Sequence, residues 1–166
     1  MSQLGAGGGR MGGSTPGRPS GPGRFAGAAP RPEQEQTGLV QDTDYEAIVV
    51  RGEAEALVRV AEQVGARLAR SLSTSQIRGI FGTVRRIEMN WQDSSPEARR
   101  QQAQRDLVLL KPKLAYQAKR QGAGVQQLRE VLTPAIDRVK GDRARFRNFV
   151  DFFEAILAYH RAHGGR

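Results

Sequence analysis

Apolar side chains recur along most of the chain at intervals of three and four residues, the spacing that gathers them on one face of an α-helix. The first run extends from Tyr45 to Leu68, and Gly52 is a potential break within it. No segment alternates apolar and polar residues as a half-buried strand does, and no internal repeat is visible. The pattern predicts an all-α fold, a compact bundle of about five helices.

Capping residues indicate where the second and third helices begin. The second helix has either Thr74 or Ser75 as its N-cap and ends at Trp91. The third helix follows a turn, with Ser95 as its N-cap and Pro96 at its first helical position. Both helices carry a stripe of apolar residues at helical spacing, so each can pack against a common core.

The third helix contains a proline well inside its predicted length. It extends to Gln121, and Pro112 is expected to kink or split it near Leu110, because proline lacks an N–H and clashes with the preceding turn. A glycine-rich segment, Gly122–Gly124, ends it. The fourth helix then uses these apolar residues: Val125, Leu128, Val131, Leu132, Ile136 and Val139.

The fifth helix carries two apolar stripes. One consists of Phe146, Phe149, Val150, Phe153 and Leu157, and the other of Phe152, Ile156 and Tyr159. Two stripes imply two packing partners. Either the helix is central and buried on both sides, or the second stripe (Phe152, Ile156 and Tyr159) is a subunit interface.

The N-terminal part of the chain has a different composition. Residues 1–36 are mostly Gly, Pro, Ser and Arg, and such a segment cannot bury enough apolar area to offset its conformational entropy. We therefore expect a disordered tail over residues 1–40 and a helical domain over residues 41–166. The tail is either a dispensable extension or a loose electrostatic tether to RNA.

The charge balance narrows the class of partner. The net charge is +9 and the pI is about 10.9, which indicates a polyanionic ligand. The tail has four arginines and two glutamates, so +7 of the total belongs to the helical part. Nucleic acid is favoured over a membrane, because no apolar run approaches the ~18 residues of a spanning helix.

Two predicted helix faces concentrate this charge. In the third helix, Tyr116 lies among four cations, and the apolar residues that would dock the helix lie on another face. The cations are Lys111, Lys113, Lys119 and Arg120. In the second helix, Arg78, Gly82 and Arg85 align on one face, with Arg86 beside them. Gly82 either lets a phosphate backbone approach or merely permits close helix packing, and the arginines either bind phosphate or pair with surface acids.

Catalytic and metal chemistry fit the sequence poorly. There is no cysteine, which excludes disulfides and thiolate sites and is compatible with a cytoplasmic protein. His160 and His163 have the spacing of a shared metal site, but histidines in a last helical turn also complement the helix dipole. No catalytic residue, metal site or cofactor is predicted, so we do not expect an enzyme.

Three segments in this order resemble one family. They are Thr74–Arg78 (TSQIR), Leu110–Tyr116 (LKPKLAY) and Glu154–His160 (EAILAYH), the last preceded by Phe149 and Phe152 and followed by Gly164-Gly165. Over about residues 45–165 the chain is similar to the small subunit of type III-A CRISPR effector complexes, subunit two of the Csm complex. The long Gly/Pro/Arg tail is not part of that pattern.

The resemblance implies a helical, non-catalytic cytoplasmic protein whose copies stack head to tail in a ribonucleoprotein. Its partners would be other subunits, the guide RNA and the single-stranded target RNA. By motif, Arg78, Lys111 and Lys113 would contact phosphates. Three further cations are added by position alone: Arg85, Lys119 and Arg120. Tyr116 would stack on a base or sugar, or pack within the protein. The alternatives are a DNA-binding regulator that uses residues 74–91 as a recognition helix, and a small nuclease.

Overall fold

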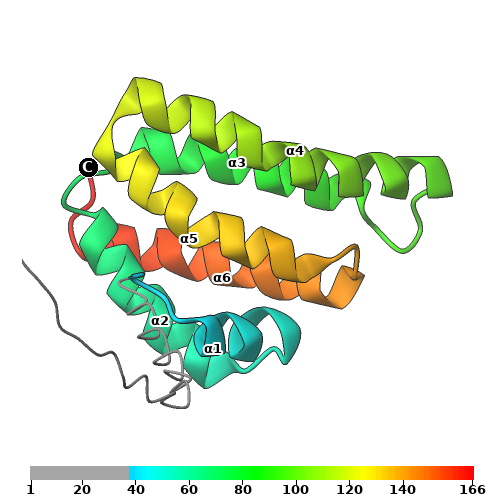
Figure 1. Cartoon of the computed structure of the whole chain (residues 1–166), viewed down its shortest axis with the longest axis horizontal. Coiled ribbons are helices and arrows are strands. Elements are labelled where there is room, and N and C mark those ends of the chain that lie inside the picture. The colour runs from blue at the N-terminus through cyan, green and yellow to red at the C-terminus, as the bar shows by residue number, and fades with distance from the viewer. Residues whose placement is uncertain (1–37) are drawn as a thin grey trace, which may run out of the picture. The chain divides into compact units, whose positions relative to one another are not determined.

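The computed structural model describes residues 38–166, and every regular element in that range is helical (Figure 1). In chain order the elements are α1 (Asp42–Tyr45), the π-helix η1 (Glu46–Val50), α2 (Ala54–Leu68), α3 (Thr74–Asn90), α4 (Glu97–Gln121), α5 (Ala123–Val139) and α6 (Arg143–Ala162). The prediction of an all-α bundle is confirmed. The tail predicted over residues 1–40 lies outside the described residues except for its last three.

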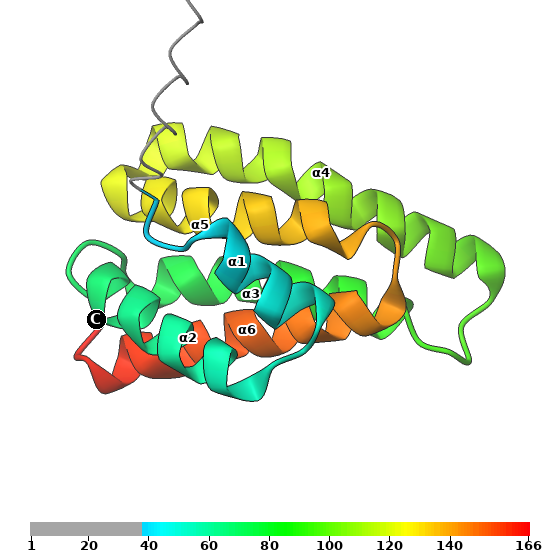
Figure 2. The ribbon, with the colours of Figure 1, turned by 60° about the horizontal axis from the view of Figure 1, so that its bottom comes forward.

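Helix α6 lies at the centre of the bundle. It packs against α2, α3, α5 and η1, whereas α4 packs against α3 and α5. Both views place α4 on the opposite side of the bundle from α2 (Figure 1 and Figure 2). The side of the bundle away from α2 is therefore formed by α4 and its neighbours.

Both apolar stripes of α6 are buried. Phe146 stacks on Trp91 with ring centroids 4.6 Å apart. On the other stripe, Phe152 and Ile156 have no exposed surface, and Tyr159 is half-buried. A side chain without exposed surface cannot contact another subunit. Other helices of the same chain cover Phe152 and Ile156, so the prediction that these two residues belong to a subunit interface is wrong and the alternative of a central helix holds for them. Tyr159 packs against the core but keeps some exposed surface.

The first two predicted helices differ in detail from the observed ones. The first is divided at Gly52, whose φ of +69° is a conformation that glycine adopts readily. The N-cap of α3 is Ser73, so Thr74 and Ser75 lie in its first turn. The Ser73 hydroxyl accepts from the Gln76 N–H at 3.2 Å, and the Gln76 side chain accepts from the Ser73 N–H at 2.9 Å. This reciprocal capping box fixes the start of α3.

Helix α4 is more regular than predicted. Its N-cap is Pro96 and not Ser95, and it continues through Pro112 to Gln121 as one helix. Pro112 and Val108, the residue whose carbonyl loses its helical partner, are both exposed. Water can therefore replace the missing hydrogen bond, and the proline does not split the helix.

The last turns of α6 and the residues that follow it hold the beginning of α3. His160 is fully buried, and its Nε2 lies 2.7 Å from the carbonyl oxygen of Leu72. The Thr74 hydroxyl donates to the Gly165 carbonyl at 2.9 Å, and the Thr74 N–H donates to the Arg166 carbonyl. These contacts fix the first turn of α3 against the end of α6.

Candidate nucleic-acid interface

The outward face of α3 carries arginines around two exposed glycines. Arg78 and Arg86 are exposed, and neither forms an ion pair within residues 38–166. A Cβ added to Gly79 or Gly82 would meet no atom within 4 Å. Gly82 therefore does not serve close helix packing, and the backbone at both glycines is open to a ligand.

Arg85 has a more crowded environment than the other arginines of α3. Its Nη1 lies 2.6 Å from Glu88 Oε2. Burial raises the pKa of Asp151 on α6, as does the charge of Glu154, whereas the charges of Arg147 and Arg85 lower it. The net shift is upward. Arg85 thus interacts with acids on two helices and is less available for phosphate than Arg78.

The two lysines of the Lys-Pro-Lys segment differ in the same way. The Lys111 Nζ lies 2.5 Å from Asp137 Oδ1 on α5, whereas Lys113 is exposed and has no ion pair within the described range. Two residues along a helix correspond to a rotation of about 200°. Lys111 therefore points toward α5, and Lys113 lies on the side of Gln117, which faces α3. The structure brings Lys113, but not Lys111, to the surface shared with α3.

Tyr116 is a surface residue. It is 63% exposed, and the Arg120 guanidinium lies 5.5 Å from the centroid of its ring. Packing in the core does not explain this tyrosine. Its ring and the charges of Lys119 and Arg120 are open to solvent, as base stacking and phosphate binding both require.

A groove of about 290 Å³ separates the beginning of α3 from the end of α4. It is lined by Ser75, Gln76, Gly79, Ile80, Gln117 and Gln121, none of which is charged. On the α4 side, Lys113 and Arg120 lie one helical turn before and after Gln117. On the α3 side, Arg86 lies about two turns after Gly79 on the same face, whereas Arg78 is turned about 100° away from Gly79. The groove therefore has a neutral, mainly polar lining and cations on both of its sides. We call it the α3–α4 groove.

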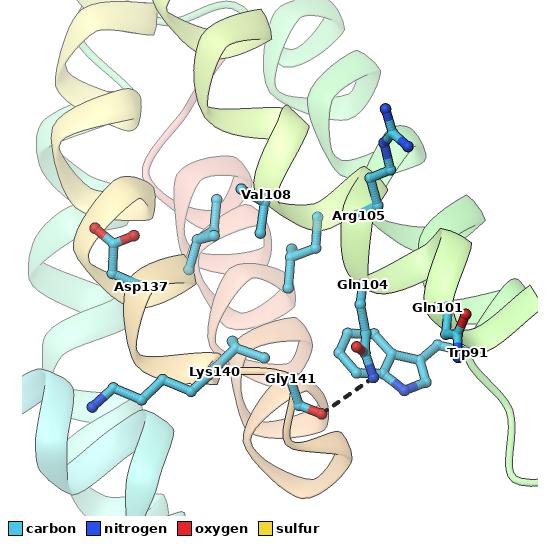
Figure 3. Close-up of a pocket in the computed structure, with 11 residues that line it drawn as sticks. Trp91, Gln101, Gln104, Arg105, Val108, Asp137, Lys140 and Gly141 are labelled. Atoms are coloured by element: carbon cyan, nitrogen blue, oxygen red, sulfur yellow. Dashed lines mark hydrogen bonds between the residues drawn. The ribbon is translucent and has the colours of Figure 1, made fainter. Parts of the chain in front are cut away.

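A second groove, between α4 and α5, has a different character (Figure 3). Its volume is about 490 Å³, and its apolar walls include Trp91, Leu107, Val108, Ile136 and Val139. Arg105 and Lys140 line it as cations, but so does Asp137, the partner of Lys111. An acid on the wall makes this groove less suitable for phosphate than the α3–α4 groove.

The two histidines are not placed as a metal site. His160 is engaged by the Leu72 carbonyl, whereas His163 is exposed and stacks on Tyr159 with ring centroids 6.5 Å apart. Within residues 38–166, no three His, Cys, Asp or Glu side chains gather as metal ligands. None of the helices in this range is long and apolar enough to cross a membrane.

Sequence reasoning found the cations of the surface but not the groove between them. The groove lining includes Gly79, Gln117 and Gln121. These residues carry no charge and follow no apolar stripe, so neither the charge pattern nor the apolar spacing identifies them as site residues. The one signal in the sequence was the i, i+4 spacing of the two glutamines, which places both amides on one side of α4.

Comparison with known proteins shows the family of the chain. A family model described as Csm2 Type III-A matches residues 51–166, a range that includes α2 to α6 and all the cations of the candidate interface. No curated protein and no solved structure matches. Since the matched range covers well over half of the sequence, the chain belongs to the Csm2 family and is a subunit of a type III-A CRISPR complex.

Proposed function

We propose that the chain is a non-catalytic RNA-binding scaffold subunit of its complex. It binds the backbones of the guide RNA and of the target RNA paired with it, and it holds the target for cleavage by other subunits. It acts in the cytoplasm and associates there with other subunits and with copies of itself. Base pairing between the two RNAs supplies sequence specificity, and the protein recognises backbone and shape.

The observation that carries this proposal is a set of exposed cations on α3 and on the C-terminal half of α4 that have no ion-pair partner within residues 38–166. They are Arg78, Arg86, Lys113, Lys119 and Arg120. Lys and Arg bind phosphate chiefly through charge, and each contact releases counterions from the nucleic acid. An acid of the same chain that pairs with such a cation would reduce its contribution to phosphate binding, as Asp137 does for Lys111.

The test measures binding of the full chain to a short single-stranded RNA and to duplex DNA at matched salt, by fluorescence anisotropy. With about four phosphate contacts, log K for RNA should fall with log salt with a slope of about −3, and Kd should lie near 10⁻⁴ to 10⁻⁶ M at physiological salt. Binding should not depend on RNA sequence. A flat salt response would refute the proposal, and tighter binding to duplex DNA would favour a DNA-binding regulator.

A charge-matched control separates this surface from general basicity. Arg78→Ala removes one positive charge from α3, and Arg67→Ala removes one from α2, where Arg67 is also exposed. Only Arg78→Ala should weaken RNA binding and make the salt slope less negative. Equal effects of the two substitutions would show that net charge, and not this surface, accounts for binding.

A further inference from the structure

We infer that the α3–α4 groove binds one unstacked nucleobase of an RNA strand whose phosphates lie on the flanking cations. This inference rests on the proposed RNA-binding function and adds a base-contacting site to it. The groove has a volume of about 290 Å³, at the lower limit of the roughly 300–1,000 Å³ of small-molecule sites. It suits a single planar ring better than a longer ligand.

The chemistry of the lining matches the edge of a base. Gln117 and Gln121 line the groove from α4, and neither side chain forms a hydrogen bond with another described residue. An amide offers both a donor and an acceptor, so it can bind complementary groups on any of the four bases. The Ser75 hydroxyl, from α3, can likewise donate or accept. Such a site holds a base without selecting a sequence.

The apolar part of the groove lining suits the face of a base. It includes Ile80, which is 3% exposed, and the backbone of Gly79. Glycine is among the least favourable residues inside a helix, and packing does not require it here, because a Cβ on Gly79 would meet nothing within 4 Å. A larger side chain at this position would fill the space beside Gln117. The glycine therefore keeps the groove open.

Two other grooves among the described residues combine these features less well. The groove between α4 and α5 includes Asp137, and a shallow site on α2 includes Glu55 and Glu62. Their carboxylates would repel the phosphates on either side of a bound base. The α3–α4 groove has an uncharged lining, with Lys113 and Arg120 beside it on α4 and Arg86 on the Gly79 face of α3. It is therefore a neutral site within a cationic surface, as nucleotide binding requires.

The experiment compares two RNA strands of the same length and charge. One is a uridine strand of about 12 nucleotides, and the other carries abasic sites at alternate positions. Both are titrated with the full chain at the same salt concentration, so that backbone contacts are equal and only base contacts differ. The intact strand should bind about 10-fold more tightly, since stacking and hydrogen bonding of a base contribute on this scale.

Two glycine variants then locate the base contact. Gly79→Leu fills the groove and should bring the ratio of the two affinities close to one. Gly82→Leu is the matched control, because it changes a second open helical glycine outside the groove. Any effect it has on backbone contacts falls equally on both strands, so the ratio of the two affinities should not change. If Gly79→Leu does not fold, the combined variant Gln117→Ala, Gln121→Ala removes both amides and should also lower the ratio.

Failure of this inference is distinguishable from failure of the proposed function. If the unmodified protein binds neither strand, the RNA-binding function itself is wrong. If it binds the intact and abasic strands equally, RNA binding stands and the base site is overturned. If the ratio is large but survives both Gly79→Leu and the double glutamine variant, a base is bound elsewhere and the assignment to this groove is overturned.

Discussion

The different environments of Lys111 and Lys113 predict different losses of RNA binding when each is replaced by alanine. Lys113 has no ion pair within the described range, so Lys113→Ala should remove about one phosphate contact. The slope of log K against log salt should then become less negative by about 0.7, the value for one contact with a single strand. Over a fourfold increase in salt, the variant should lose about 2.6-fold less affinity than the unmodified chain.

Lys111→Ala should leave this slope nearly unchanged, because the Lys111 Nζ is already 2.5 Å from Asp137 Oδ1. It frees the Asp137 carboxylate, so any loss of affinity should be restored by adding Asp137→Asn. Salt titrations followed by fluorescence anisotropy measure both quantities. Melting should change little, since exposed charges and surface ion pairs contribute at most about 1 kcal/mol. Equal changes of slope for the two single variants would refute the reasoning.

Three further predictions concern the fold. Ile156→Glu should abolish folding, visible as loss of helical circular dichroism, because it buries an unpaired carboxylate in the core; a folded variant would contradict the burial of this stripe. Gly65→Ala should lower the free energy of unfolding by about 1–3 kcal/mol in urea titrations, since a Cβ there would lie 2.6 Å from Tyr159 Cβ. Gly82→Ala should raise the free energy of unfolding by about 1 kcal/mol, because alanine favours a helix more than glycine does and a Cβ there meets open space. Asp151→Asn should raise the melting temperature at pH 7, because the pKa of Asp151 is higher in the folded state and its ionised form therefore destabilises the fold. This gain in melting temperature should vanish below about pH 4, where Asp151 is protonated in both states.

Much of the fold could be predicted, because apolar spacing alone identifies a helix and its buried face. Ile77 and Leu114 are fully buried, as their stripes require. The exact ends were less predictable: the cap of α3 is Ser73 because its pairing with Gln76 outweighs the equally good capping chemistry of the next residues. Pro112 was expected to break α4, but the break depends on whether water can reach the freed carbonyl, which only the packed structure shows.

Of the candidate site, only the exposed charged residues could be predicted from the sequence. The exposure of Arg78 and Lys113 follows from their positions off the apolar stripes. The pairing of Lys111 with Asp137 does not, because it depends on how α4 packs against α5. The position of Gln117 in a groove could not be predicted either, since a groove is formed by two helices together. The burial of Phe152 likewise required knowledge of which helices surround α6.

The contacts that fix the first turn of α3 have a consequence for the order of events during synthesis. They join residues 88 and 91 positions apart, through His160 with Leu72 and Thr74 with Gly165. Contacts this distant in sequence cannot form until the ribosome has released both partners. We expect nascent chains stalled before His160 to be cleaved by protease between α2 and α3, and completed chains to resist. The surface at Arg78 would then be able to bind RNA only after α6 has been translated. Unfinished chains would therefore not bind RNA through this surface.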